Sequence, residues 1–290
     1  MAEAGAEEDG EEAAGAVVAA SAEAVAEGLA DLAAEVSVEE EPAEAGSTCQ
    51  ANMEAKLTEL VGKLKSAAGD NLRAVVLYGS AVTGEFVAAH SDLNILCIVD
   101  RAGSSEIEDL HDVAEWWNKQ GNPMPIVFTF DELHRSADIF AIEILDMKHR
   151  HRMLFGEDFL ANLEVPMHLH HLQVERELRN KWLRLRQAVL EAPHKNRILL
   201  QIMLDSVSAF CALFRHALLA LGQPLPHTKR EAVEAIAAVT GADPSAFCAI
   251  LDLRHGKKKK REIDIEESLH TYLEFVAVVT NEVDRRLEAR

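Results

Sequence analysis

The sequence predicts an α/β half followed by a bundle of helices, with a disordered segment at the N-terminus. Short runs rich in β-branched residues alternate with helical patterns up to about residue 160. From about His168 onward, apolar residues recur only at helical spacing. The first fifty residues hold fourteen of the 49 acidic residues and none of the 29 basic ones. These observations place a tail at 1–50, an α/β domain at 51–162 and a helical domain at 163–290.

The N-terminal tail is rich in Ala and Glu and contains no aromatic residue. Such a segment buries too little apolar surface to offset the entropy lost on ordering, so we expect disorder, with a transient helix over Val17–Val36 as the alternative. It lacks the basic start and compact apolar stretch of a signal peptide. Because the tail contributes −14 to a formal net charge of −20, the rest carries only −6. Extensive nucleic-acid binding, which needs a broad basic surface, is therefore not expected.

Cysteine spacing and hydropathy favour a cytoplasmic protein without a membrane span. The most apolar stretch, Ile198–Leu221, is interrupted by polar and charged residues and predicts a central bundle helix. No two cysteines have the spacing of a metal site or a redox motif, so reduced thiols are expected. The four cysteines are Cys49, Cys97, Cys211 and Cys248.

The α/β half begins with an amphipathic helix over Ala51–Ala67, whose apolar residues form one stripe. Two buried strands follow, over Leu72–Leu77 and Leu93–Val99. Ser105 and Glu108 have the spacing of a capping box and start a second helix. The later elements predicted in this half are a strand over Pro125–Phe130, a short helix capped by Thr129 and Glu132, a strand over Phe140–Leu145 and a helix over Lys148–Phe155.

The second half contains only helical patterns. Gly222 and the prolines that follow it end the longest apolar helix, because they cannot continue it. The predicted helices are one over Leu172–Val189, one over Arg197–Leu221, one that starts at Asp243–Pro244 and one over Ile263–Leu287.

The motif that carries chemistry is Leu77–Ser80, then ten residues, then Ser91–Asn94. A strand ends at a Gly-Ser turn, where backbone N–H groups and a hydroxyl can hold phosphate oxygens. Side chains two apart on the next strand point to the same side. Asp92 and Asn94 therefore present two oxygen-bearing groups that can hold Mg²⁺ against a triphosphate.

This arrangement resembles the DNA polymerase beta-like nucleotidyltransferase superfamily, whose signature is Gly-Ser, a spacer of similar length, and Asp-x-Asp or Asp-x-Glu on the following strand. It is most similar to the small bacterial members, the minimal nucleotidyltransferases and the aminoglycoside nucleotidyltransferases. The resemblance covers roughly residues 55–165 and implies a nucleotidyltransferase core with a mixed sheet. The helical remainder is similar only in architecture to the substrate-side bundles of these enzymes.

The resemblance also implies a reaction, the Mg²⁺-dependent transfer of a nucleoside monophosphate from an NTP to an acceptor hydroxyl on a small molecule or a protein. Gly79 and Ser80 would hold the β- and γ-phosphates. Asp92 and Asn94 would take part in catalysis as ligands of a two-metal site. The acceptor would lie between the two halves, where clefts between domains usually hold ligands.

Members of the superfamily carry a third metal carboxylate on a later strand. The segment Ile142–Asp146 looks like that strand, and the resemblance assigns the third carboxylate to Glu143 as a catalytic and metal-binding residue. Asp146 is the alternative, because the sequence leaves the strand register open by a residue or more.

Position 94 departs from the family pattern, because Asn94 stands in place of the second metal carboxylate. An amide offers one neutral oxygen, whereas Mg²⁺ prefers anionic ligands in octahedral geometry. The loss should weaken metal binding by at least about 10–100-fold, the range seen when outer-shell partners of a metal site are lost. Two functions remain open: a transferase attenuated by Asn94, and an inactive relative that binds a nucleotide or, like antitoxin-type members, a protein partner.

Three basic or histidine-rich stretches allow both a solvated and a ligand-binding interpretation. Lys257–Arg261 is five consecutive bases, either a flexible loop or a phosphate contact. His149–Arg152 is either a solvated helix face or a triphosphate contact. His168, His170 and His171 have no evident acidic or thiol partner for a metal, so we expect solvated side chains at a helix start.

Overall fold

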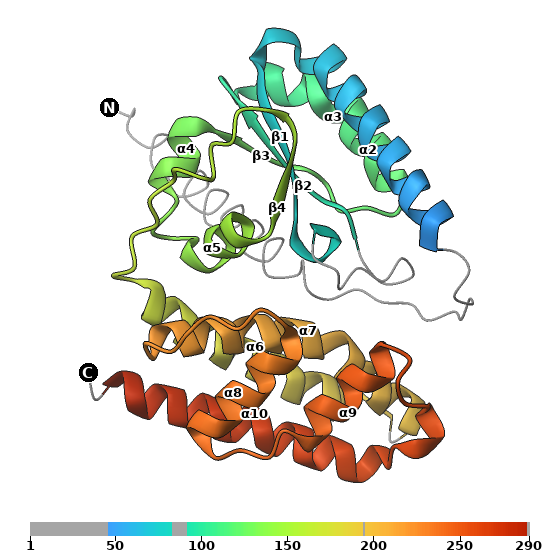
Figure 1. The fold of residues 1–290 in the computed structure, drawn as a ribbon, viewed down its shortest axis with the longest axis vertical. Coiled ribbons are helices and arrows are strands. Elements are labelled where there is room, and N and C mark those ends of the chain that lie inside the picture. The colour runs from blue at the N-terminus through green and yellow to red at the C-terminus, as the bar shows by residue number, and fades with distance from the viewer. Residues whose placement is uncertain (1–45, 83–91, 194, 289–290) are drawn as a thin grey trace, which may run out of the picture.

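The computed structural model describes residues 46–82, 92–193 and 195–288, which form two lobes (Figure 1). Within these residues the first lobe is a four-stranded sheet with helices on both faces, and the second is a bundle of five helices. This is the α/β half followed by a helical bundle that the sequence predicts.

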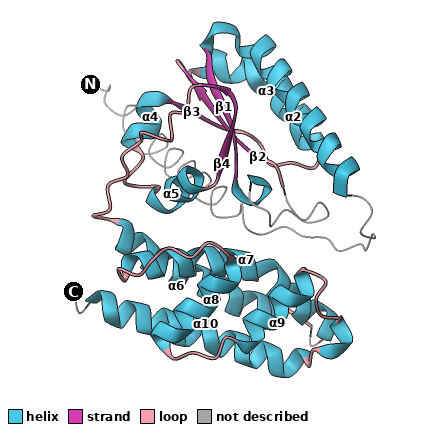
Figure 2. Ribbon diagram, in the orientation of Figure 1, coloured by secondary structure: helices cyan, strands magenta, loops and turns pink. Residues whose placement is uncertain are grey.

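The sheet of the first lobe consists of β1 (Leu72–Tyr78), β2 (Asn94–Val99), β3 (Ile126–Thr129) and β4 (His151–Gly156). Its strand order is β3-β2-β1-β4 (Figure 2). The sheet is mixed, because β1 pairs antiparallel with both β2 and β4, whereas β3 pairs parallel with β2. Only one residue of β1 is exposed and all of β2 is buried, as expected for strands covered on both faces.

Four helices cover this sheet, α2 (Gly46–Ala68) and α3 (Ser104–Lys119) on one face, α4 (Phe130–Arg135) and α5 (Ala141–His149) on the other. Successive side chains of a strand point to opposite faces. Val75 and Leu77 therefore join the core beneath α2 and α3, whereas Val76 and Tyr78 join the core beneath α4 and α5. Strand β1 thus connects both cores of the lobe.

The bundle consists of α6 (His170–Glu191), α7 (Asn196–Ala220), α8 (Lys229–Thr240), α9 (Ser245–Arg254) and α10 (Ile265–Glu288). Its centre is a group of aromatic rings from α7, α9 and α10. The Phe247 ring stacks on Tyr272 with centroids 4.0 Å apart, and Phe214 contacts Phe247 at 5.4 Å.

Short 3₁₀ helices lie at η1 (Gly69–Asn71), η2 (Gly79–Val82) and η3 (Lys260–Glu262).

Helix α7 is the only helix of the described residues that is long and apolar enough to cross a membrane. Of its most apolar 18-residue window, 61% is buried inside the protein. Phe210 and Phe214 on α7 are almost fully buried in the bundle core. The helix therefore lies at the centre of the bundle, as the pattern of Ile198–Leu221 predicts.

Two consecutive elements differ from the prediction. The segment predicted as a strand over Phe140–Leu145 belongs to helix α5, and the segment predicted as a helix over Lys148–Phe155 contains strand β4. The first run is apolar except for Glu143, so its periodicity is ambiguous, but Ala141, Ile144 and Met147, spaced by three, are buried positions of α5. Strand β4 forms because it pairs with β1, a long-range interaction that local pattern does not reveal.

One of the two predicted capping boxes is confirmed. The Thr129 hydroxyl accepts a hydrogen bond from the Glu132 N–H at 3.2 Å, and the Glu132 carboxylate accepts one from the Thr129 N–H at 2.8 Å. The other box, Ser105 with Glu108, is wrong. Gly103 is the N-cap residue of α3, and glycine has no side chain to accept a hydrogen bond.

The N-terminal boundary also differs, because α2 begins at Gly46, five residues before the helix expected to start at Ala51. Residues 1–45 lie outside the described residues, and the expected disorder and the transient helix at Val17–Val36 fall there.

A glycine at the end of β4 provides a test of this strand assignment. Gly156 has a φ of 80°, and a Cβ at this position would lie 1.9 Å from the Arg73 carbonyl oxygen. Gly156→Ala should therefore lower the free energy of unfolding by more than the about 1–3 kcal/mol that positive φ alone costs. Gly241→Ala is the control, because Gly241 has a φ of 76° and a Cβ added there would meet no atom within 4 Å. Equal losses in urea unfolding would contradict the close approach of β4 to β1.

Candidate functional site

The candidate site lies at the edge of the sheet where β1 ends. Tyr78, the last residue of β1, pairs with Asn94 at the start of β2 and with His151 at the start of β4. Because both neighbours run antiparallel to β1, their first residues meet its last residue. This edge of the sheet lobe faces the bundle (Figure 1).

Gly79 follows β1 directly and adopts a φ of 83°, which glycine reaches without steric cost. Its N–H donates a hydrogen bond to the Arg150 carbonyl oxygen at 3.1 Å. A Cβ at Gly79 would lie 3.1 Å from Asn94 Nδ2. Gly79, the turn residue of the sequence motif, and Asn94, which stands in place of the second carboxylate of that motif, are therefore neighbours in space.

Asn94 is buried, with 5% of its surface exposed, and its Oδ1 has no hydrogen-bond partner. A buried acceptor without a donor costs about 1–3 kcal/mol, so it is a feature that a ligand can relieve. Asp92 lies two residues before β2 and is partly exposed. The Ser80 side chain and Ser91 lie outside what the structure describes, so their predicted roles stay predictions.

Glu143 and Asp146 lie on helix α5 rather than on the expected strand. They are three residues apart and so share one helix face. Asp146 Oδ1 lies 2.8 Å from Arg215 Nη1 and 3.3 Å from His216 Nε2, both on α7. The charged neighbours of Glu143 include Glu177 of α6, His216 and Asp146. Both carboxylates therefore belong to the junction between α5 and the bundle.

The two carboxylates of α5 differ in protonation. Burial, reinforced by Glu177 and Asp146, raises the pKa of Glu143 to about 7. Burial also acts to raise the pKa of Asp146, but His216, Arg215 and Arg150 together outweigh it and lower that pKa to about 2. Asp146 is therefore an anion committed to an ion pair. Removing one partner of a buried pair typically costs about 3–5 kcal/mol.

A pair of buried histidines extends this ion pair into the bundle. His170 Nε2 lies 3.0 Å from His216 Nδ1, and the two side chains are each 1% exposed. The expectation that His170 is solvated is therefore wrong, and burial, with His216 and His171, lowers its pKa to about 4. The second ring nitrogen of His216, Nε2, lies 3.3 Å from Asp146 Oδ1, so the histidine pair adjoins the ion pair.

Sequence reasoning missed Arg215 and His216 as functional residues. Their signal was present, since charged and polar residues inside an apolar helix such as Ile198–Leu221 need buried partners. The four residues Asp146, Arg215, His216 and His170 are called the junction cluster below.

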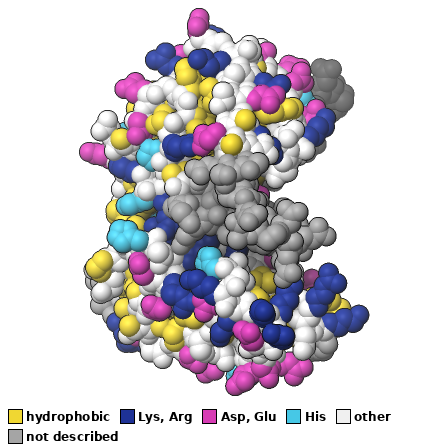
Figure 3. Space-filling model, turned by 45° about the vertical axis from the view of Figure 1, so that its right-hand side comes forward, with side chains coloured by type: hydrophobic (Ala, Val, Ile, Leu, Met, Phe, Trp, Pro, Cys, Tyr) yellow, Lys and Arg dark blue, Asp and Glu magenta, His cyan; other side chains and the backbone are white. Residues whose placement is uncertain are grey.

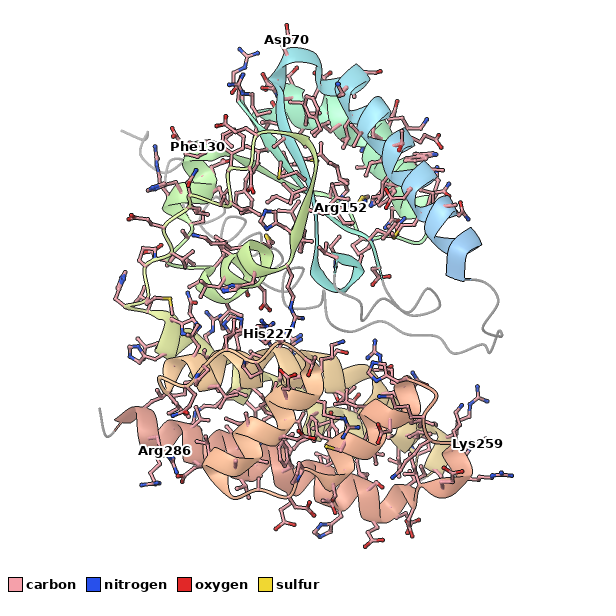
Figure 4. All side chains as sticks on the ribbon, in the orientation of Figure 1. Asp70, Phe130, Arg152, His227, Lys259 and Arg286 are labelled. Carbon is pink, nitrogen blue, oxygen red and sulfur yellow. The ribbon has the colours of Figure 1, made fainter. Side chains whose placement is uncertain are left out.

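Cationic side chains from both lobes donate hydrogen bonds to groups of the bundle. Arg150 Nη2 donates to the His227 carbonyl oxygen at 2.7 Å, and Figure 4 shows His227 on the side of the bundle that faces the sheet lobe. Two residues further on, Lys229 Nζ donates to the hydroxyl of buried Ser208 at 3.1 Å. Arg254 Nη1 donates to the same hydroxyl at 2.7 Å. In Figure 3, Lys and Arg side chains gather on the part of the bundle that lies next to the sheet lobe.

The donor groups at the edge do not fit a two-metal site. Asp92 supplies one carboxylate and Asn94 one neutral amide oxygen, while Glu143 lies among the charges of the junction. Over residues 46–82, 92–193 and 195–288, no group of three or more His, Cys, Asp or Glu side chains is arranged to hold a metal ion. Mg²⁺ requires several hard oxygen ligands at octahedral positions. No catalytic step is therefore assigned to bound metal.

Comparison with known proteins gives a distant structural match. No protein-family model matches the chain, and no curated protein matches it in sequence. Among solved structures, the chain is similar to spectinomycin adenyltransferase from Enterococcus faecialis, whose crystal structure was determined with ATP and spectinomycin. The identity is 14%, the match covers 81% of this chain and 99% of that chain, and the TM-score is 0.46. Such a likeness carries no inference about activity, which has to come from the residues of the site.

Glu143 and His170 should give the stability of the protein opposite pH dependences. Glu143 has a pKa raised from 4.5 to about 7, so its stabilising contribution is present below pH 4.5 and is lost as the pH rises through 7. His170 has a pKa lowered from 6.5 to about 4, so its contribution is present above pH 6.5 and is lost as the pH falls through 4. The free energy of unfolding of Glu143→Gln, relative to that of the parent, should increase as the pH rises. That of His170→Gln, relative to the parent, should increase as the pH falls.

The measurement is urea unfolding of the parent and both variants at several pH values between 4.5 and 7.5, a range set by these pKa shifts. If neither difference from the parent changes with pH, the two side chains do not occupy the buried junction described above.

Proposed function

We propose that this chain is a nucleotidyltransferase-like protein that binds a nucleoside triphosphate at the Gly79 edge, and that Asn94 attenuates the transfer reaction. The acceptor would be a hydroxyl on a small molecule or a protein, bound between the two lobes. The proposal joins the two functions that the sequence left open, because binding and transfer need different residues.

The contact between Gly79 and Asn94 carries this proposal. A turn with positive φ after a buried strand lets a ligand approach the backbone closely. Asn94 Nδ2 lies beside this turn, and Asn94 Oδ1 is buried without a hydrogen-bond partner, so it can accept a hydrogen bond from a ligand. A nucleotide offers both kinds of group, since its phosphates accept hydrogen bonds and its ribose hydroxyls donate them.

The charges around the edge support triphosphate binding without two metals. A triphosphate is strongly anionic, so a site that holds few metal ions must supply cations of its own. Arg150 lies beside Gly79, and Lys229 and Arg254 converge on one buried hydroxyl of the bundle. These side chains would supply part of the charge that two Mg²⁺ ions supply in an active two-metal site.

Attenuation of transfer follows from the carboxylates. In two-metal chemistry the ions neutralise the phosphates and activate the attacking hydroxyl. With a single carboxylate at the edge, and with Asp146 paired to Arg215, the anionic ligands for this chemistry are missing from the described residues. Binding is therefore the function that these residues support best.

Gly79→Ala tests the binding site. The new Cβ would approach Asn94 Nδ2 at 3.1 Å and narrow the turn where phosphate is proposed to bind, so ATP affinity in a calorimetric titration should fall at least about tenfold, or about 1.4 kcal/mol. Gly121→Ala is the matched control, because Gly121 has a φ of 82° and open space around its Cβ position. The control carries the same conformational cost and should keep the affinity of the parent. Equal affinities in both variants would remove the turn from the site.

Asn94→Asp tests the cause of attenuation. The carboxylate adds an anionic oxygen at nearly equal volume, so Mg²⁺ with ATP should raise the melting temperature of the variant more than that of the parent. Without ligand the variant should be less stable than the parent, because an unpaired charge is then buried near Asp92. Asn122→Asp is the control, since Asn122 is also buried, at 8% exposure, with an unpaired amide nitrogen. If both variants respond to Mg²⁺-ATP as the parent does, Asn94 does not face the ligand.

A further inference from the structure

A continuous series of bonds connects the junction cluster to the Gly79 turn. Arg215 binds the Asp146 carboxylate at 2.8 Å. The backbone carbonyl of Asp146 accepts the Arg150 N–H at 3.0 Å, and the Arg150 carbonyl accepts the Gly79 N–H at 3.1 Å. Asp146 is therefore joined by one backbone hydrogen bond to Arg150, the residue that holds the Gly79 turn.

A second connection runs through the segment before α8. Arg215 Nε donates to the Pro226 carbonyl oxygen at 3.1 Å, and Arg150 Nη2 donates to the next carbonyl, that of His227, at 2.7 Å. Two arginines, one from each lobe, therefore bind adjacent carbonyl groups of the same segment. The ion pair between Arg215 and Asp146 and the two arginine–carbonyl bonds therefore link the corner of the sheet lobe at Asp146 and Arg150 to the bundle at two points.

The histidines of the junction cluster fix this arrangement from inside the bundle. His170 binds Nδ1 of the His216 ring, and the other ring nitrogen, Nε2, lies 3.3 Å from Asp146 Oδ1. Arg215, His216 and His170 are each at most 3% exposed, so these contacts are shielded from water on the bundle side, whereas the Asp146 side chain is 30% exposed.

We propose that Asp146 is a positioning residue, which together with Arg215 and His216 fixes the corner between α5 and β4 against the bundle and thereby holds the Gly79 turn in its ligand-binding geometry. The consequence for affinity rests on the proposed nucleotide site, whereas the consequence for the turn does not. The bundle thus contributes to the geometry of the site, because the junction cluster sets the shape of the Gly79 turn.

Asp146→Asn in the full chain tests the proposal, because it keeps the side-chain volume and removes the charge that binds Arg215 and His216. The Gly79 amide should exchange with deuterium at least about tenfold faster than in the parent, as expected when the local opening equilibrium shifts by that factor. Its ¹⁵N–¹H resonance should also move, since the hydrogen bond to Arg150 is disturbed. ATP affinity should fall by a similar factor. Asp146→Glu, which keeps a carboxylate, should restore part of both properties.

Asp252→Asn is the matched control. Asp252 pairs with Arg230 inside the bundle and is 24% exposed, close to the 30% of Asp146. The control should lower overall stability and leave the Gly79 amide unchanged. A Gly79 amide that is unchanged in Asp146→Asn, or changed equally in both variants, would overturn the proposal. If the parent shows no ATP binding, the proposed function fails, while the Gly79 amide in these variants still decides whether Asp146 positions the turn.

Discussion

The end of β1 is the constraint on which the candidate site depends. β1 is the strand between β2 and β4, and its side chains enter both cores of the sheet lobe, so its position is fixed from two sides. The chain must then turn at a residue that adopts positive φ, and Gly79 meets this requirement. Antiparallel pairing brings Asn94 and the start of β4 to the same point. The neighbours of a bound ligand are thereby determined by strand pairing rather than by loop conformation.

The charged groups around this edge bear differently on the binding of an anionic ligand and on a metal-dependent transfer reaction. The anionic groups on α5 face the bundle, where Asp146 is neutralised by Arg215 and Glu143 has a pKa raised to about 7. Among the described residues, the edge itself is left with Asp92, a neutral amide at Asn94 and Arg150. A cation beside the turn favours an anionic ligand by direct charge pairing, whereas the described residues supply fewer anionic ligands than two Mg²⁺ ions require.

The sequence predicted the parts of this site that depend on local pattern. Buried β-branched runs predicted β1 and β2, and the Gly-Ser spacing correctly brought Gly79 close to Asn94. The assignment of Glu143 to a strand failed, because a short apolar run such as Phe140–Leu145 does not distinguish a strand from a buried helix, and only pairing of β4 with β1 decides between them. Arg215 and His216 appeared in the sequence only as interruptions of an apolar run. The role of these two residues depends on contacts between the two lobes, which a local sequence pattern does not reveal.

A crystal structure of the full chain with Mg²⁺ and a non-hydrolysable ATP analogue tests the central claim most directly. We expect the triphosphate beside the Gly79 turn, with a ligand group donating to Asn94 Oδ1 and without a pair of metal ions. Arg150 and Lys229 would contact the phosphates. A structure with two Mg²⁺ ions coordinated by Asp92, Asn94 and Glu143 would contradict the account, and so would a nucleotide bound away from this edge.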